Sequence, residues 1–368
     1  MSVIDTNLPK PTLIDLFAGC GGVTQGFKNA GFEPIVAVEW DDKAAKTYRL
    51  NHDSPNLKLY TENIRDLSPS QVMKDCGLNR GDLTVLSVCA PCQPFSRQNR
   101  NPQKKEQAKL VLEMKRFVQE LQPQFAIMEN VPDLAKGQNR QYLDEVIAYL
   151  RHELNYRVLE PQVIDAVNYG VPQFRKRLIL LCSRDNIDLT IPPSTHAKPK
   201  LNQMGLRPWQ TVGDAFIPLS RSRLASGQRS PLYDWHKAPK HSEKVINRLK
   251  HIRPNGGSRK DLPKELELPC HRKGTGFNDV YGRMDKRKPA NTLTTGCTNL
   301  SKGRFAHPTA NRSITPREAA CLQTFPIDYR FCGSYTSVST QIGNAVPVKL
   351  AEVLANHLYK LWRDNLVS

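Results

Sequence analysis

Cys92 is the residue whose type and surroundings best suit covalent chemistry. It follows an apolar, β-branched run at 83–88, which predicts a buried strand, and it lies between Pro91 and Pro94. Open α/β sheets bind their ligands at the carboxyl ends of strands, and a thiolate there can act as a nucleophile. The plainer alternative is a buried structural thiol, since free cysteine often behaves as a small apolar residue. The two prolines and the polar loop at 98–107 favour a fixed, solvent-facing nucleophile.

Acidic and basic side chains suited to assist a nucleophile occur further along the chain. Glu129 ends a predicted strand at 125–128, and Arg175 and Arg177 lie in a short basic turn before another. A carboxyl group can transfer a proton, and a guanidinium fork can hold a carboxylate, a carbonyl oxygen or a phosphate. The alternatives are a strand-end acid that only pairs with an arginine and a solvated basic turn.

A glycine-rich turn lies between the first predicted strand and the first predicted helix. Gly19, Gly21 and Gly22 let a ligand approach the backbone and leave the N–H groups of the helix N-terminus accessible. The dinucleotide fingerprint would also need glycine at position 24, where this chain has Thr24. The turn therefore predicts a ligand site that is not a pyrophosphate cradle.

An acidic and an aromatic residue follow the glycine turn at a spacing along the chain that suits ligand binding. Glu39 lies 20 residues beyond Gly19, at the end of the second predicted strand, where an acid can hold both hydroxyls of a ribose. Trp40 follows it and can lie flat against an adenine ring. Together they favour an adenosine-type cofactor without a pyrophosphate over the alternative, a tight turn beside a surface acid.

The elements that must position these residues alternate between strands and helices. Apolar runs predict the strands, and helical periodicity together with capping boxes at Ser68 and Thr315 predicts the helices. The predicted strands lie at 12–17, 35–38, 83–88, 125–128, 156–167 and 178–182. The predicted helices lie at 23–29, 42–50, 69–76, 110–121, 142–150 and 347–364, with a further helix starting after Thr315. This alternation predicts an α/β fold with a doubly wound, mostly parallel sheet.

The region 186–312 differs from the rest of the chain. Proline, glycine and basic residues dominate it, and clear periodicity is lost. We therefore expect one α/β domain from residues 1–185 plus 313–368, and a second, smaller irregular domain from 186–312.

The charge of the chain points to a polyanionic partner. Lys and Arg number 53 and Asp and Glu 35, which gives a net charge of +18. Residues 185–312 alone hold 24 basic and 10 acidic residues. Because the excess is regional, it favours nucleic acid over the alternative of an evenly solvated surface.

Composition also bounds the class and location of the protein. No run approaches 18 uncharged apolar residues, so no membrane span is expected, and residues 1–10 lack the pattern of a secretory signal. Nine cysteines without disulfide-framework spacing favour reduced thiols. We expect a cytoplasmic, nucleoid-associated protein with no structural metal.

Six segments, in order, resemble the DNA cytosine-5 methyltransferase family of bacterial restriction-modification systems. They cover most of residues 12–185 and 313–360. The segments are Asp15-Leu16-Phe17-Ala18-Gly19-Cys20-Gly21-Gly22, Pro91-Cys92-Gln93-Pro94-Phe95-Ser96, Glu129-Asn130-Val131, Gln173 with Arg175 and Arg177, Arg317-Glu318-Ala319-Ala320 with Leu322-Gln323-Thr324-Phe325-Pro326, and Gln341-Ile342-Gly343-Asn344-Ala345-Val346-Pro347.

The resemblance implies the S-adenosylmethionine-dependent methyltransferase fold, with this cofactor over the carboxyl ends of the strands. Positions that match the family's cofactor pocket are Phe17, Gly19, Cys20, Gly22, Glu39, Trp40, Asn63, Ile64, Pro91, Leu110, Asn344 and Val346. The family commonly has aspartate where this chain has Asn63, whose amide oxygen can still accept a bond from the adenine amino group. We therefore expect weaker binding there rather than a loss of function.

The resemblance also implies double-stranded DNA as the substrate and a target-recognition role for residues 186–312. The matching candidates for DNA contact are Gln93, Ser96, Arg97, Gln173, Thr292 and Leu293. The expected product of the cofactor is S-adenosylhomocysteine. A monomer is expected, with a cognate restriction endonuclease as a functional partner, and the sequence does not indicate which bases flank the target.

The implied mechanism is covalent. The Cys92 thiolate adds to C6 of a cytosine flipped out of the duplex, which makes C5 nucleophilic. Protonated Glu129 donates to N3, Arg175 donates to O2, and Arg177 holds Glu129 or the DNA backbone. The loop at 93–109 is expected to close over the base, and the sequence does not identify the group that removes the C5 proton.

Three other functions compete with this interpretation. An RNA cytosine-5 methyltransferase of the same fold is disfavoured by the context Pro94-Phe95-Ser96 and by the basic region 186–312. A catalytically inactive DNA-binding relative is disfavoured by intact Cys92, Glu129 and Arg175. A redox or zinc protein could use the pair Cys89 and Cys92, but no second pair or nearby histidine completes a metal site.

Overall fold

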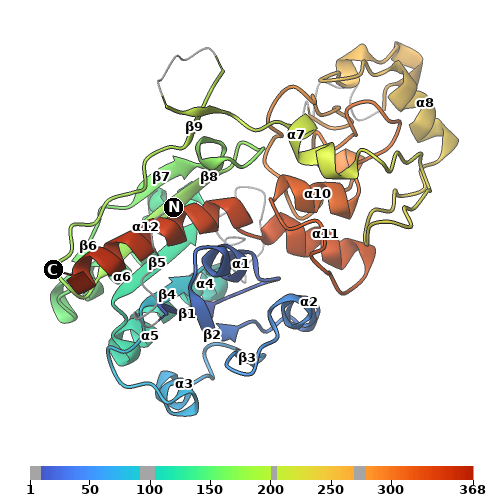
Figure 1. Cartoon of the computed structure of the whole chain (residues 1–368). Coiled ribbons are helices and arrows are strands. Elements are labelled where there is room, and N and C mark those ends of the chain that lie inside the picture. Colours follow the sequence, from blue (N-terminus) through green and yellow to red (C-terminus); the bar gives the residue numbers. More distant parts are fainter. Residues whose placement is uncertain (1–9, 92–103, 200–204, 269–278, 368) are drawn as a thin grey trace. The chain divides into compact units, whose positions relative to one another are not determined.

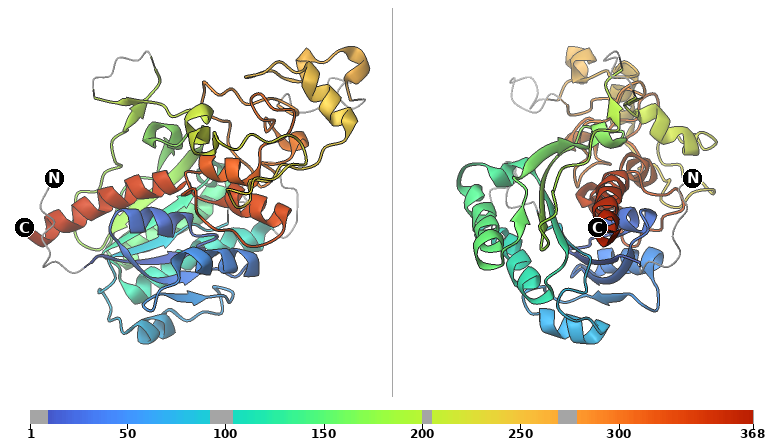
Figure 2. Two further views of the ribbon diagram at one scale, coloured as in Figure 1. Left: turned by 45° about the vertical axis from the view of Figure 1, so that its right-hand side comes forward. Right: turned by 60° about the vertical axis from the view of Figure 1, so that its left-hand side comes forward.

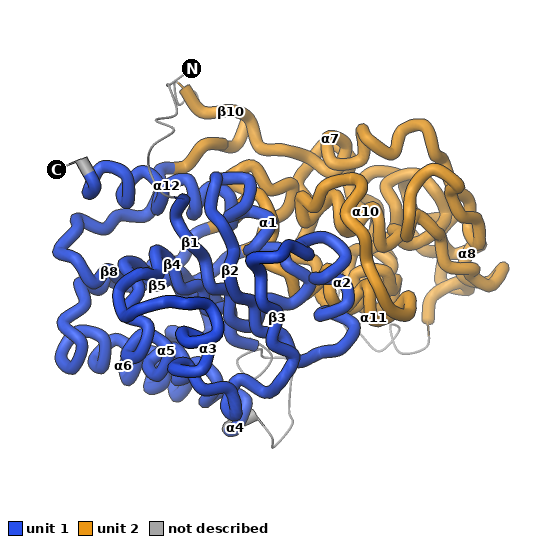
Figure 3. The backbone as a smooth tube through the Cα atoms, turned by 60° about the horizontal axis from the view of Figure 1, so that its bottom comes forward, with its two compact units in different colours: residues 1–164, 176–193, 351–368 blue, residues 165–175, 194–350 orange. Residues whose placement is uncertain are grey.

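A computed structural model describes residues 10–91, 104–199, 205–268 and 279–367. Contacts between Cα atoms divide the chain into two compact units. Unit 1 comprises residues 1–164, 176–193 and 351–368, and unit 2 comprises 165–175 and 194–350 (Figure 3). The two units are described separately.

Unit 1 is built on one mixed sheet (Figure 1). Its strand order is β3-β2-β1-β4-β5-β8-β6, and β7 also pairs with β8. The strands are β1 (Thr12–Leu16), β2 (Glu33–Val38), β3 (Lys58–Tyr60), β4 (Val85–Val88), β5 (Phe125–Asn130), β6 (Arg157–Val158), β7 (Gln162–Asp165) and β8 (Lys176–Ser183). The five strands from β3 to β5 are parallel, whereas β8 is antiparallel to β5. The predicted doubly wound, mostly parallel sheet is confirmed.

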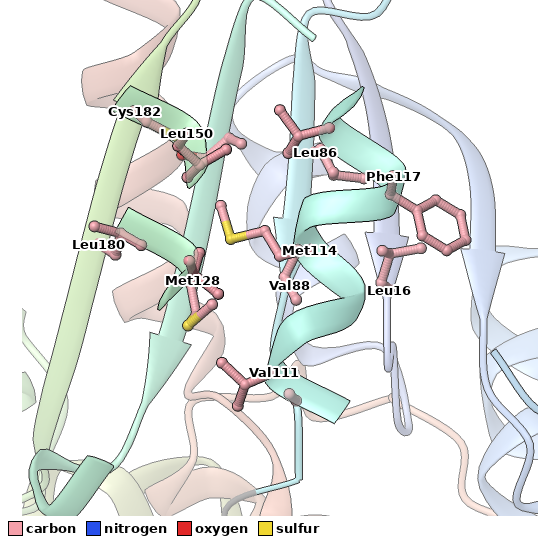
Figure 4. Close-up of a cluster of buried hydrophobic side chains, with 14 of the residues drawn as sticks. Leu16, Leu86, Val88, Val111, Met114, Phe117, Met128, Leu150, Leu180 and Cys182 are labelled. Atoms are coloured by element: carbon pink, nitrogen blue, oxygen red, sulfur yellow. The ribbon is translucent and has the colours of Figure 1, made fainter. Parts of the chain in front are cut away.

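Helices cover both faces of this sheet (Figure 2). One face carries α3 (Pro69–Cys76), α5 (Glu113–Leu121) and α6 (Arg140–Ala148), and the other carries α1 (Gly22–Asn29) and α12 (Val348–Val367). Two further helices of this part of the chain are α2 (Asp42–His52) and α4 (Lys104–Ala108). Leu16, Met114 and Phe117 are fully buried where α5 packs on the sheet (Figure 4). Their burial fixes the carboxyl ends of the strands that carry the candidate site.

Unit 2 contains short elements joined by long irregular segments. Its regular elements are β9 (His196–Ala197), β10 (Arg207–Pro208), α7 (Val212–Phe216), α8 (Glu243–His251), α10 (Pro316–Leu322) and α11 (Tyr335–Asn344). A small apolar cluster that includes Leu249, Ile252 and Leu300 forms part of its interior. The capping box predicted at Thr315 is present, since Thr315 accepts from the backbone N–H of Glu318 and the Glu318 carboxylate accepts in return.

The compact units divide the chain at different positions from the expected domains. Residues 313–350 group with unit 2 because α10 packs against α7 and α11, and because Glu318 binds Arg312. Residues 165–175 also belong to unit 2. The expected functional division at 186 and 312 stays a prediction.

No helix among the described residues has the length and apolarity needed to cross a membrane.

Candidate active site

The glycine turn has the open backbone that its sequence predicts. Phe17 and Gly19 have φ values of 60° and 57°, in the left-handed region, and Gly21 caps α1 with a φ of 91°. A Cβ atom added at Gly19 would meet no atom within 4 Å. There is therefore open space directly beside the Gly19 backbone, where a ligand can approach. Cys20 and Gly22 are buried, and burial raises the pKa of the Cys20 thiol to about 12.

Glu39 is joined to the glycine turn by a direct hydrogen bond. Its Oε2 accepts from the Gly19 N–H at 2.8 Å and its Oε1 accepts from the Asp41 N–H at 2.7 Å. Burial raises the pKa of Glu39, while these backbone N–H groups oppose that shift. Each carboxylate oxygen keeps a lone pair that could accept from a hydroxyl. Trp40, next in the chain, is 70% exposed, so its ring is available to stack on a ligand.

The remaining candidate cofactor residues of unit 1 follow the ends of β3 and β4 or lie near α5. Asn63 is half-buried and its Oδ1 accepts from the Arg65 N–H, so it caps a local turn. Ile64 is buried, whereas Pro91 and Leu110 are half-buried. Arg116, which the sequence did not single out, donates to the carbonyl oxygens of Ile64 and Leu67 at 2.6 Å. Its guanidinium therefore fixes the segment that carries Asn63.

Asn344 and Val346 belong to unit 2. Asn344 is the exposed last residue of α11, and Val346 is 7% exposed. Their expected part in the cofactor pocket stays a prediction.

Glu129 and Arg177 form an ion pair in unit 1. The Arg177 Nε lies 2.5 Å from the Glu129 Oε1, and the two side chains are 9% and 12% exposed. Glu129 pairs across the antiparallel strands with Ile179, and Arg177 lies two residues before Ile179 on the same face. The guanidinium thus reaches the carboxylate diagonally and stabilises its negative charge. Of the two roles predicted for Arg177, holding Glu129 or the DNA backbone, the structure has the contact with Glu129, and the catalytic roles of both residues stay predictions.

Asn130 joins the end of β5 to the segment that leads to the nucleophile. Its Nδ2 donates to the Ala90 carbonyl at 3.0 Å, and its Oδ1 accepts from the Val131 N–H at 2.9 Å. Because β4 and β5 are adjacent and parallel, Ala90 leaves the sheet beside Glu129. Sequence reasoning included Asn130 in a motif but missed this role. Cys92, Gln93, Ser96 and Arg97 lie outside the described residues.

Arg175 lies in unit 2 and is 2% exposed. Its Nη1 donates to the Leu293 carbonyl at 2.9 Å, and its Nη2 donates to the carbonyls of Gly343 and Ala345 at 3.0 and 3.1 Å. The guanidinium therefore holds two distant backbone segments together. A contact of Arg175 with cytosine O2 stays a prediction, and these three bonds would compete with it.

Gln173 and Leu293, two of the candidate DNA contacts, are buried and bound to each other. The Gln173 Oε1 accepts from the Leu293 N–H at 3.1 Å, and its Nε2 donates to the Leu322 carbonyl at 3.0 Å. Thr292 is exposed, and its hydroxyl donates to the Phe174 carbonyl at 2.6 Å. Of these three residues, Thr292 alone is exposed, and the proposed DNA contacts stay predictions.

This arrangement can be compared with known proteins. The sequence model of the C-5 cytosine-specific DNA methylases matches residues 12–360. The chain belongs to this family. It is 33% identical over 352 residues to the Type II methylase M.HgiDII of Herpetosiphon aurantiacus, which covers 94% of each chain. It is 31% identical to the Type II methyltransferase M1.HphI of Haemophilus parahaemolyticus, over 95% of this chain and 87% of the relative.

Solved structures show the same fold. A prophage-encoded DNA modification methyltransferase of E. coli superposes with a TM-score of 0.74 at 23% identity, covering 96% of this chain and all of the other. The Dnmt2 methyltransferase of S. pombe gives a TM-score of 0.62 at 16% identity, covering 95% and 99%.

Family membership confirms that the chain is a DNA cytosine-5 methyltransferase, in a family that uses S-adenosylmethionine and is found in restriction-modification systems. Among the described residues no cluster of three or more His, Cys, Asp or Glu side chains could hold a metal ion. Cys92 lies outside those residues, so this finding does not test the Cys89 and Cys92 pair.

Proposed function

We propose that this methyltransferase acts through a covalent bond between the Cys92 sulfur and C6 of a cytosine flipped out of double-stranded DNA. The observation that carries the proposal is the Glu129–Arg177 ion pair at the carboxyl end of β5. The neighbouring strand β4 leads to Cys92, and Asn130 fixes the intervening Ala90. The nucleophile and the acid would thus lie together at the carboxyl ends of two neighbouring strands.

The chemistry follows from these residue types. Attack of the Cys92 thiolate on C6 breaks the aromaticity of the ring and moves negative charge toward N3 and O2. Glu129, once protonated, would donate its proton to N3 so that this charge is neutralised as it forms, and Arg177 would stabilise the carboxylate left behind. C5 becomes nucleophilic and accepts the methyl group. Loss of the C5 proton and departure of the thiolate then restore the aromatic ring.

Arg177 is better placed than Arg175 to face the base in this proposal. Arg177 already holds Glu129, whereas the Nη groups of Arg175 donate to three backbone carbonyls. We therefore assign the contact with O2 to Arg177 and a structural role to Arg175. This departs from the sequence prediction, which gives O2 to Arg175.

The residues at the glycine turn fit S-adenosylmethionine. Gly19 has open space beside its backbone, Glu39 presents carboxylate lone pairs, and the Trp40 ring is exposed. Gly19 and Glu39 would hold the adenosine part and Trp40 would stack on its ring, with Asn63 accepting from the adenine amino group. When bound, the cofactor supplies a methyl group on a positively charged sulfur.

The regional excess of basic residues supports duplex DNA as the substrate, with residues 186–312 as the recognition domain. Base flipping is required because C6 is not accessible inside a stacked duplex. A cognate restriction endonuclease, a monomeric state and a cytoplasmic, nucleoid-associated location remain parts of the proposal.

A duplex containing 5-fluorocytosine tests the nucleophile, since fluorine at C5 blocks the last step and traps the adduct. Wild-type enzyme with S-adenosylmethionine should form a denaturation-resistant complex, and Cys92→Ser should not. Cys89→Ser, three residues earlier, is the matched control and should still trap. Trapping by Cys92→Ser at the wild-type level would exclude Cys92 as the attacking residue. Bisulfite sequencing of a host that expresses the enzyme would give the recognition site.

A further inference from the structure

Three polar side chains are fully buried beneath the glycine turn of unit 1. They are Asp15 on β1, Thr24 on α1 and Tyr48 on α2, each with no exposed surface. The Thr24 hydroxyl donates to the Asp15 Oδ2 at 2.8 Å and lies 2.9 Å from the Tyr48 hydroxyl. Since Thr24 has one hydroxyl proton and gives it to Asp15, Tyr48 must donate to Thr24. The three side chains form a directed chain of hydrogen bonds.

No cation among the described residues is paired with Asp15. Burying such a carboxyl group is costly, so this hydrogen-bonded group of side chains needs an explanation. Among the described residues, the groups that face Asp15 are the hydroxyls of Thr24, Tyr48 and Ser87, the backbone N–H of Thr24, the Cys89 thiol and the Glu39 carboxyl group. Burial is the main cause that raises the pKa of Asp15 to about 7. A leucine or valine would fill the same space without this cost.

The hydrogen-bond chain joins the three elements that display the candidate cofactor residues. β1 leads directly into Phe17 and Gly19, and α1 begins at Gly22. α2 begins just after Glu39 and Trp40, and Asp41 caps it by accepting from the backbone N–H groups of its first turn. A change in either of the two hydrogen bonds would move the Gly19 backbone relative to Glu39.

Thr24 also occupies the position at which the dinucleotide fingerprint has its third glycine. A glycine there could make neither hydrogen bond. His52, at the end of α2, reinforces the same connection, because it hydrogen-bonds the Gly21 backbone and its ring lies 4.7 Å from that of Tyr48. Burial lowers the pKa of His52 to about 3, so it is neutral.

We propose that Asp15, acting through Thr24 and Tyr48, is a positioning residue that fixes the glycine turn against α2 and thereby sets the affinity for the cofactor. This inference rests on the proposed cofactor role of the turn. It does not require any of the three side chains to touch the ligand.

The test compares Thr24→Val, which keeps the shape but removes the hydroxyl, with Thr24→Ser, which keeps the hydroxyl. Thr24→Val should raise the KM for S-adenosylmethionine about tenfold while kcat stays within about twofold, as for a loss of ground-state binding. Thr24→Ser should remain near wild type, and Tyr48→Phe should show a smaller rise in KM. The KM for DNA should not change in any of them.

The pH dependence of the KM for the cofactor provides a second test, because a purely structural role of Asp15 would not change it. The KM of the wild type for the cofactor should change between about pH 6 and pH 8, and Asp15→Asn should flatten this change. Glu39→Gln serves as the control for the site itself. If Glu39→Gln leaves the KM for the cofactor unchanged, the proposed cofactor site is wrong.

If Glu39→Gln raises that KM but folded Thr24→Val and Asp15→Asn do not, the site stands and the positioning role is overturned. Circular dichroism and the melting temperature establish folding. Should Thr24→Val fail to fold, Tyr48→Phe and Asp15→Asn decide the question by the same criterion.

Discussion

Unit 1 and unit 2 bury different kinds of large side chain. Among the described residues, the four largest that are fully buried are arginines, and all belong to unit 2: Arg175, Arg283, Arg312 and Arg317. The largest in unit 1 are aromatic, such as Tyr48, Phe27 and Phe117. The difference follows the difference in regular structure between the two units.

In unit 1, paired strands and helices satisfy most backbone groups, so apolar side chains can fill the interior. In unit 2, long irregular segments leave carbonyl oxygens that need donors. Arg283 shows the solution, because its guanidinium donates to the carbonyls of Leu249, Ile252, His307 and Ala310 and to the Asn311 side chain. Arginine supplies five donors in one plane, which no apolar residue can replace. A buried arginine thus substitutes locally for the hydrogen bonds of a sheet.

The largest expected effect is at Arg283. Arg283→Met keeps the length of the side chain but leaves four carbonyls without this donor, two in buried and two in part-buried hydrogen bonds, and should cost about 4 kcal/mol. Urea unfolding of the full chain gives the free energy, and hydrogen exchange should show the loss of protection within unit 2. Arg287→Met is the control, since Arg287 is 70% exposed and pairs with the carboxylate of Asp285, which is 8% exposed, and should cost about 1 kcal/mol or less. An equal loss of unfolding free energy in the two variants would contradict the idea that buried arginines stabilise unit 2 by donating to its carbonyl oxygens.

A smaller loss of unfolding free energy is expected when the pH is lowered. Burial lowers the pKa of His307 from 6.5 to about 4, and Arg312, Arg283 and His236 oppose its protonation, although Glu318 favours it. Its Nδ1 accepts from the backbone N–H groups of Thr309 and Ala310, which also requires the neutral ring.

Since the unfolded chain binds this proton more readily, the stability that neutral His307 contributes is complete above about pH 6.5. About 3 kcal/mol is then lost as the pH falls toward 4. Glu318, whose pKa is lowered to about 2 largely by Arg312 despite its burial, adds a further loss below about pH 4.5. Unfolding free energies measured between pH 7 and 4 check this. His307→Asn keeps an acceptor for the two N–H groups and should remove the His307 share of the loss above pH 4.5 but not the share of other buried histidines such as His52. A profile identical to that of the wild type would contradict the assignment.

The smallest effect is expected in unit 1. Met114 on α5 is fully buried among aliphatic side chains, and Met114→Leu should cost less than about 1 kcal/mol because volume and polarity hardly change. The same urea experiment measures it. A cost as large as that of Arg283→Met would mean that the interior of unit 1 is no more tolerant than that of unit 2.

The regular part of the fold could be predicted because its apolar pattern is local. β1, β2, β4, β5 and β8 begin or end within about two residues of their predicted positions. β3 was missed because its three residues are at least partly exposed, and α11 because its serines and threonines give no clear apolar stripe. The single strand predicted at 156–167 is divided into β6, β7 and a short helical turn, with Pro161 between the strands.

The candidate site was predictable where spacing along the chain decides it. The 20-residue interval from Gly19 singled out Glu39, which accepts a hydrogen bond from the Gly19 N–H, while its predicted contact with a ribose stays a prediction. Arg177 contacts Glu129, one of the two roles predicted for it. The partners of Arg175 lie 118 to 170 residues away, and no local pattern could indicate them. Asp15 was quoted as part of a motif, but its burial depends on three elements packing together, which the sequence alone does not reveal.

The reversed direction of β8 has a consequence for how variation is tolerated near Glu129, the proposed catalytic acid. Side chains alternate between the two faces of a strand, so the meeting of Arg177 with Glu129 depends on an even offset between Arg177 and Ile179. Removing or inserting one residue just before Leu178 would turn the guanidinium to the opposite side of the sheet. Insertions or deletions at this position in related chains should therefore comprise two residues, or should lie before the strand begins.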